Sequence, residues 1–350
     1  MDGIGSKEIE AEERGVRGGG ARQFDGNEAR DREMQIWSLF PEMRGQKLSR
    51  DVRLETVLDL ELCEGIPVLR FPGLKECDFV EHLVSTRAGG VSTGMFSTMN
   101  FSISLGDSPE NVKENYRRIA KAMHCRYGDM VGTRQTHTTN IRRVTVKDMG
   151  NGIAFPDAYQ DVDGLVTNIP GITLACYGAD CVPLLFVDTG KRAIGVAHSG
   201  WRGTAGDMAG RMVRRMGEEY GTDPSDLRVA IGPSICQSCY EVDQQVADVF
   251  LELLGDCGEE LEAVKRTKRY RMMRENGVRR PVEPGKEPGK FQMDLWLTNL
   301  ILLMRAGVAP EQVEVTDLCT CHNPGILFSH RASRGKRGNL GAFLKIRQGV

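Results

Sequence analysis

A thiol and an imidazole flank two apolar runs within residues 175–203 of the sequence. Cys181 directly precedes the run at residues 182–187, and His198 directly follows the run at residues 193–197. Both runs have the length and β-branched content that are typical of buried strands. If the strands are antiparallel neighbours, the two side chains meet at one sheet edge. Such a pair suits zinc or copper, and it equally suits a thiolate nucleophile with its base.

His137 completes a candidate set of metal ligands with Cys181 and His198. The three residues lie 44 and 17 positions apart (137 to 181 to 198), so only the fold can assemble them. Three protein ligands leave a position open for water, as in catalytic zinc sites, and zinc lowers the pKa of that water to about 7. The remaining histidines fit a strand, a helix or a C-terminal loop: His82, His124, His322 and His330.

A second group of thiols forms a rival metal site. Cys236 and Cys239 make a C-x2-C motif, and residues 319–322 read Cys-Thr-Cys-His. Together they could hold a structural zinc ion. Against this, a C-x-C pair is tight around one tetrahedral ion, and buried or free thiols are the simpler interpretation.

Three arginines lie where an anion could bind. Arg87 is in a glycine-rich loop, Arg202 precedes a predicted helix, and Arg331 is in the last loop. The strand-to-helix turn at residues 200–204 offers free backbone N–H groups, which favour phosphate or carboxylate, and guanidinium groups suit the same ligands. No phosphate-binding loop or dinucleotide motif is present, so nucleoside triphosphate and dinucleotide binding have no support.

The composition allows one large domain or two small ones, and the lack of an internal repeat or a clear linker favours a single domain at residues 51–350. The chain has 350 residues, a formal net charge of −2 and 40% hydrophobic residues, which gives no reason to bind nucleic acid or membranes. Residues 1–50 mix charge with glycine and are expected to be a disordered extension. Ten cysteines without an export signal indicate reduced thiols in the cytoplasm. Residues 257–290 are expected to be a basic surface insertion, in which residues 265–280 could bind a polyanion such as nucleic acid, although a solvated loop is the simpler interpretation.

Periodicity and capping residues predict the secondary structure around these candidates. The predicted helices follow Ser108, Thr204 and Asp294, and one covers residues 240–254, whereas residues 313–315, 327–329 and 342–346 are predicted strands.

Seven motifs, in this order, resemble one family over residues 67–346. They are TRAGGVS (86–92), Gln-x-His (135–137), DVDGLVTN (161–168), ADCVPLLFVD (179–188), AHSGWRGT (197–204), IGPSI with YEV (231–242) and CT…FSHR (319–331). This is the laccase-domain family, first described as multicopper polyphenol oxidoreductases and later as purine nucleoside phosphorylases with adenosine deaminase activity. Some members are called peptidoglycan editing factors.

The resemblance implies a fold, a cofactor and an activity. The fold is α/β (α+β), a single-domain layered sandwich of mixed β-sheets flanked by helices. The cofactor is one zinc ion on His137, Cys181 and His198. The activity is phosphorolysis of adenosine, inosine and S-methyl-5′-thioadenosine, with nucleosides and phosphate as small-molecule partners, together with deamination of adenosine.

Deamination at zinc needs a carboxylate that shuttles protons. The chain has no H-x-E motif, so Asp163 and Asp180 are the candidates, although Asp180 could equally cap a turn.

Relatives commonly end with Ser-Tyr-Arg-Arg and a later Thr-Gly-Arg, and this chain departs from both. Arg334 and Arg337 are candidate replacements for the missing arginines.

Two other activities stay open at the level of sequence. Cys181 could be the nucleophile and His198 the base of a cysteine hydrolase that acts on cell-wall amide or peptide bonds. Copper-dependent polyphenol oxidation needs many imidazole ligands, and six histidines spread over loops and helices fit that poorly.

Overall fold

The computed structural model describes residues 58–267 and 280–349 of the chain. The expected N-terminal extension at residues 1–50 lies outside these ranges, as does most of the basic stretch at residues 265–280. Within the two described ranges, no helix is long and apolar enough to cross a membrane.

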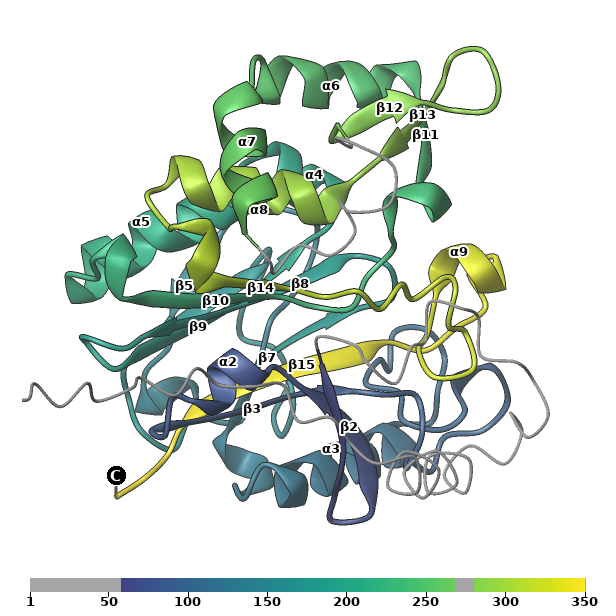
Figure 1. Cartoon of the computed structure of the whole chain (residues 1–350). Helices are drawn as coiled ribbons and strands as arrows, with labels where there is room; N and C mark the ends of the chain where they lie inside the picture. Colours follow the sequence, from purple (N-terminus) through teal and green to yellow (C-terminus); the bar gives the residue numbers. More distant parts are fainter. Residues whose placement is uncertain (1–57, 268–279, 350) are drawn as a thin grey trace, which may run out of the picture.

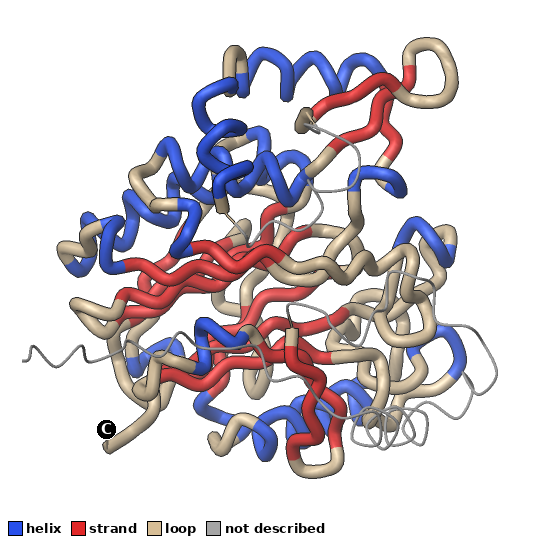
Figure 2. Tube along the Cα trace, viewed as in Figure 1, coloured by secondary structure: helices blue, strands red, loops and turns tan. Residues whose placement is uncertain are grey.

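Two six-stranded sheets form the centre of the structure (Figure 2). The first has the order β1-β2-β3-β15-β7-β4, and the second has the order β14-β10-β8-β9-β6-β5. The first consists of β1 (Asp59–Cys63), β2 (Ile66–Arg70), β3 (Val80–Ser85), β15 (Leu340–Ile346), β7 (Thr173–Gly178) and β4 (Met130–Gly132). The second consists of β14 (Val313–Val315), β10 (Leu227–Ile231), β8 (Val182–Asp188), β9 (Ala193–Ser199), β6 (Gly164–Thr167) and β5 (Ile141–Arg143). The pairs β4–β7, β5–β6 and β10–β14 are parallel, and the other pairs are antiparallel.

Strand β8 explains why the second sheet is covered on both faces. Successive side chains of a strand point to opposite faces of its sheet. Leu184 and Phe186 belong to the core beneath the helices, whereas Leu185 and Val187 belong to the core shared with the first sheet. All seven residues of β8 are buried, so its uninterrupted apolar run contributes to two cores.

Helices cover the outer face of each sheet, which gives four layers (Figure 1). The methionine stripe of α5 packs on the second sheet, and α3 packs Val112 and Ile119 on the first. This arrangement confirms the predicted layered sandwich. Apart from α6 and α7, which are described below, the α-helices of the described residues are α2 (Pro72–Lys75), α3 (Pro109–Ala122), α4 (Trp201–Ala205), α5 (Met208–Tyr220), α8 (Leu295–Arg305) and α9 (His330–Ser333).

Much of the expected surface insertion at residues 257–290 is regular structure. Helix α7 (Gly258–Arg266) buries Leu261 and Val264 in the core that it shares with α8. Strand β13 (Lys290–Met293) pairs with both β11 (Glu241–Asp243) and β12 (Val282–Pro284) in a small sheet next to α6 (Gln244–Leu254). Of this insertion, residues 268–279 lie outside the described ranges.

Three predicted elements differ from the structure. The strand predicted at residues 327–329 is wrong: the Leu327 N–H bonds to the Asn323 carbonyl in a turn, and the Ser329 hydroxyl caps α9. The helix predicted from Thr204 is two helices, because Asp207 adopts a left-handed backbone and its side chain caps α5. The helix predicted from Tyr240 begins at Gln244, since residues 241–243 pair with β13.

The two-sided burial of β8 predicts a large cost for emptying its centre. Phe186 is fully buried, and we expect Phe186→Ala to lower the free energy of unfolding by about 3 to 5 kcal/mol, because it leaves a cavity. Phe155, which is 64% exposed, is the matched control, and its alanine variant should stay within about 0.5 kcal/mol of the parent. Urea denaturation measures both, and equal losses would contradict this account of the core.

Candidate metal centre

Adjacent ends of β8 and β9 bring Cys181 and His198 together. The strands are antiparallel neighbours in which Val182 pairs with Ser199 and Pro183 pairs with His198. Cys181 directly precedes β8, and His198 lies at the end of β9 that pairs with the start of β8. The condition that the two strands be antiparallel neighbours is therefore met.

His137 reaches the same place from the loop between β4 and β5. Its backbone is left-handed, with φ of 66°, and its ring lies edge-on to that of His198 with 4.9 Å between ring centroids. One ligand atom from each of His137, Cys181 and His198 lies within 4.8 Å of the others. Gly200 permits this approach, since a Cβ there would lie 2.9 Å from Cys181 Sγ.

The fully buried carboxylate of Asp163 holds the two histidine-bearing segments. It accepts the backbone N–H groups of Thr136, His137 and Thr138 at 3.0 to 3.1 Å. Its Oδ1 also lies 2.8 Å from Nδ1 of His198. With Nδ1 engaged, Nε2 of His198 is the nitrogen left for Cys181 or for a metal ion, an arrangement common among metal-binding histidines.

Cys181 and His198 form a thiolate–imidazolium pair when no metal is bound. Burial would raise the pKa of Cys181, but the charge of His198 and hydrogen bonds from both histidines lower it to about 6. Burial would lower the pKa of His198, but the Cys181 thiolate and Asp163 raise it to about 9. Between these two values the thiol is ionised and the imidazole is protonated.

Asp180 directly precedes Cys181 but its carboxylate has other partners. Its backbone is left-handed, with φ of 89°. Oδ1 accepts the Thr320 hydroxyl at 2.6 Å, and Oδ2 accepts the backbone N–H of Arg331 at 2.6 Å. These bonds tie the start of β8 to the loop that leads into α9. Asp163 therefore connects the two histidine-bearing segments, whereas Asp180 connects the start of β8 to residues 320 and 331.

The three predicted anion-binding arginines make different contacts. The Arg87 guanidinium donates to the carbonyls of residues 97 and 324 and lies 4.8 Å from the Phe328 ring centroid. The Arg202 guanidinium lies 4.3 Å from the ring centroid of Trp201. Arg331 donates to the carbonyls of residues 239 and 241. Arg87 and Arg331 thus connect loops, while Arg202 lies in the first turn of α4 against the Trp201 ring.

Two further side chains belong to the surroundings of Cys181. Burial lowers the pKa of the Arg337 guanidinium, and the nearby charges of Cys181 and Asp180 oppose that effect. Its Nε is buried and has no hydrogen-bond partner among the described residues. Burial and the Cys181 charge raise the pKa of Tyr240 to about 12. The departure of the chain from Thr-Gly-Arg was the sequence signal for Arg337, and the YEV motif was the signal for Tyr240.

The rival thiol group also comes together in the structure. Cys236, Cys239, Cys319 and His322 each offer a ligand atom within 4.8 Å of the others. The chain thus has two separate groups of candidate metal ligands among the described residues.

The family model described as multi-copper polyphenol oxidoreductase laccase matches residues 81–347. The chain belongs to this family. The resemblance carried by the sequence motifs is thereby confirmed, and the match covers all the candidate ligands of both groups.

Relatives within the laccase family include proteins named as nucleoside enzymes. Purine nucleoside phosphorylase YlmD of Bacillus subtilis is 34% identical over 265 residues, which cover 75% of this chain and 87% of the relative. Its namesake from Geobacillus stearothermophilus is 36% identical over 271 residues, which cover 76% and 89%. The crystal structure of YlmD from Geobacillus stearothermophilus has a TM-score of 0.71 at 33% identity, over 84% of this chain and 100% of that chain.

The donor set of this laccase-family chain fits a metal ion. One thiolate with two imidazoles suits zinc, and copper accepts the same ligands. The Asp163–His198 hydrogen bond supplies the carboxylate partner that metal-binding histidines commonly have.

The ion pair predicts an unusual pH profile of alkylation for metal-free protein. We expect the rate of Cys181 alkylation to be half-maximal near pH 6, because its pKa is lowered to about 6 and only the thiolate reacts. Cys77, whose pKa is raised by burial, is the internal control and should react only at alkaline pH.

His198→Ala removes the cation, so the Cys181 profile should shift toward or above the ordinary thiol value of about 8.5. Peptide mass spectrometry after chelator treatment measures each thiol separately. An unshifted Cys181 profile in that variant would contradict the ion pair.

Proposed function

We propose that this chain is a zinc-dependent purine nucleoside phosphorylase. Its substrates are adenosine, inosine and S-methyl-5′-thioadenosine, which phosphate converts to free base and ribose 1-phosphate or its methylthio analogue. We propose in addition that it deaminates adenosine to inosine. The observation that carries the proposal is the cluster of His137, Cys181 and His198 in a chain whose relatives are named purine nucleoside phosphorylases.

His137, Cys181 and His198 are the residues that would hold zinc. When bound, zinc supplies a Lewis acid and activates water for attack on the purine carbon that bears the amino group. Asp163 keeps Nδ1 of His198 occupied, so that the ring presents its other nitrogen. Copper is the alternative ion, because thiolate and imidazole also bind it.

Phosphorolysis requires the chain to hold an anion against the anomeric carbon of the sugar. A new C–O bond to hydrogen phosphate forms while the C–N glycosidic bond breaks, and the base leaves with a proton that replaces the one phosphate gives up. Positioning and charge stabilisation supply most of the rate in such a transfer. We assign Arg337 and Arg202 to the phosphate, with Arg87 and Arg331 supporting the loops around them.

Deamination requires proton transfer near the zinc ligands, and Asp180 is our candidate. It adjoins Cys181 and is half-buried, whereas Asp163 is fully buried and saturated by donors. Asp163 is better suited to orienting His198 than to exchanging protons with a substrate.

One observation favours a second candidate function. The order Cys181, His198, Asp163 in space is that of a thiolate nucleophile, its base and an orienting carboxylate. A cysteine hydrolase acting on cell-wall amide or peptide bonds is therefore the alternative. The two functions differ in their need for metal.

The decisive assay is incubation with adenosine in the presence and absence of phosphate. We expect adenine and ribose 1-phosphate only when phosphate is present, and inosine in both cases. Cys181→Ala should lose the zinc ion of this centre together with turnover, because it removes the thiolate ligand. Chromatography of adenine, inosine and hypoxanthine measures the products, and elemental analysis measures zinc or copper.

Absence of all these products from metal-loaded protein would contradict the nucleoside enzyme. Metal-free protein that cleaves peptidoglycan amides and loses this activity on alkylation of Cys181 would support the hydrolase instead.

The phosphate assignment predicts a specific kinetic change. Arg337→Ala should raise KM for phosphate about tenfold or more, since a hydrogen bond to a charged group contributes about 1.5 to 3 kcal/mol. KM for the nucleoside should change little. Arg334→Ala is the matched control, because Arg334 is exposed and lies three residues away. Equal phosphate KM values for the two variants would remove Arg337 from the anion site.

A further inference from the structure

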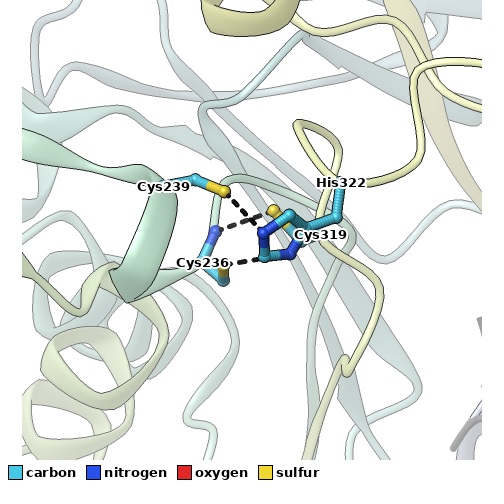
Figure 3. A group of neighbouring side chains, drawn as sticks. All are labelled: Cys236, Cys239, Cys319 and His322. Atoms are coloured by element: carbon cyan, nitrogen blue, oxygen red, sulfur yellow. Dashed lines mark hydrogen bonds between the residues drawn. The ribbon is translucent and has the colours of Figure 1, made fainter. Parts of the chain in front are cut away.

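Two short segments far apart in the sequence bring four metal-ligand side chains together. Cys236 directly precedes the 3₁₀ turn before β11 and Cys239 is its last residue, while Cys319 and His322 lie in the loop between β14 and α9. Figure 3 shows the side chains of both segments pointing toward one another. Their four candidate ligand atoms lie within 4.8 Å of one another.

The spacing in each segment explains the convergence. Cys236 and Cys239 are three positions apart, and so are Cys319 and His322. In each turn, residues three positions apart can face the same side. Because His322 rather than Cys321 completes the group, the tight C-x-C pair is not needed. The resulting pattern, C-x2-C with a distant C-x2-H, is a ligand spacing of structural zinc sites.

The distances are close to those that one tetrahedral ion imposes. Ligands bound at about 2.0 to 2.3 Å in a tetrahedron lie roughly 3.3 to 3.8 Å apart. The Cys239 sulfur lies 3.0 Å from Nε2 of His322, and the Cys236 sulfur lies 3.7 Å from Nδ1 of the same ring. The two sulfurs approach different ring nitrogens, so the side chains must rotate before one nitrogen and three sulfurs face a common centre.

The surroundings suit a thiolate-rich site. The backbone N–H of Cys236 donates to the Cys319 sulfur at 3.3 Å, and the Ser238 hydroxyl lies 3.2 Å from the Cys236 sulfur. Such hydrogen bonds stabilise metal-bound thiolates. Three thiolates around a divalent ion leave one net negative charge. The Arg331 guanidinium, which donates to the Cys239 carbonyl at 3.1 Å, supplies a compensating charge.

We propose that Cys236, Cys239, Cys319 and His322 bind a structural zinc ion, separate from the ligand set at Cys181. Four protein ligands leave no open position, so the ion stabilises structure and performs no reaction. Binding releases the remaining thiol protons and transfers no electron. Cys236 and Cys319 are buried, while Cys239 is half-buried and His322 exposed, so the ion can enter from the surface.

The two segments joined by this ion both contact Asp180. The backbone N–H of Ile235 donates to its carbonyl at 3.0 Å, and the Thr320 hydroxyl donates to its carboxylate at 2.6 Å. Each donor is adjacent in sequence to a proposed ligand. The ion would therefore stiffen the frame around the residue that precedes Cys181, whatever reaction the chain catalyses.

The test measures zinc in full-length protein that lacks the first ligand set. We expect Cys181→Ala to retain about one zinc ion per chain, since the four-ligand site is intact. Adding Cys239→Ser should remove that ion and lower the melting temperature. Adding Cys321→Ser instead should leave the zinc content unchanged, because Cys321 is outside the ligand group. Elemental analysis and circular dichroism measure content and folding.

The exposed ligand gives an independent pair of variants. On the Cys181→Ala background, His322→Ala should lose zinc, and His322→Cys should retain it because thiolate is an equivalent ligand. In the unaltered protein, zinc should protect Cys236, Cys239 and Cys319 from alkylation until a chelator is added. A zinc-free Cys181→Ala protein, a zinc content unaffected by Cys239→Ser or His322→Ala, or a Cys236–Cys239 disulfide would overturn the proposal.

Discussion

The buried carboxylate of Asp163 is the constraint on which the candidate metal centre depends. An ionised carboxylate is costly to bury unless donors surround it. Here the donors are backbone N–H groups of residues 136–138 and Nδ1 of His198. Because these donors come from the loop that carries His137 and from β9, satisfying the carboxylate also sets the separation of the two imidazoles. Local stability and ligand placement therefore arise from the same hydrogen bonds.

The β8–β9 hairpin joins this centre to the interior of the protein. Phe186 of β8 packs under the helices, and Leu185 packs between the sheets. The backbone on either side of Cys181 and His198 therefore cannot move without disturbing tightly packed cores. A rigid frame of this kind is what a ligand set assembled from distant residues needs, since metal–ligand bonds tolerate little variation in length.

The sequence was most informative where pattern and chemistry coincide. Uninterrupted apolar runs predicted β8 and β9, and their antiparallel pairing brings Cys181 to His198. The orienting role of Asp163 was not predictable, because its partners are mostly backbone groups of a loop in which His137 is left-handed. The second group of candidate ligands was visible in the sequence as a C-x2-C motif and a Cys-Thr-Cys-His motif. Which four of these residues come together was not predictable from the sequence. Choosing His322 over Cys321 depends on the loop after β14, which bonds to residue 234 through tertiary contacts.

Electrostatics connects the ligand set to the surrounding arginines. Without metal, the Cys181 thiolate and Asp163 carry two negative charges against one on the His198 imidazolium. A phosphate ion approaching this group would meet net repulsion, which the half-buried Arg337 guanidinium opposes. A divalent cation takes the place of the His198 Nε2 proton, so that these groups carry no net charge, and such an ion is often the largest charge in its site. In the proposed enzyme, metal binding and anion binding are therefore coupled, and neither can be understood from the arginines alone.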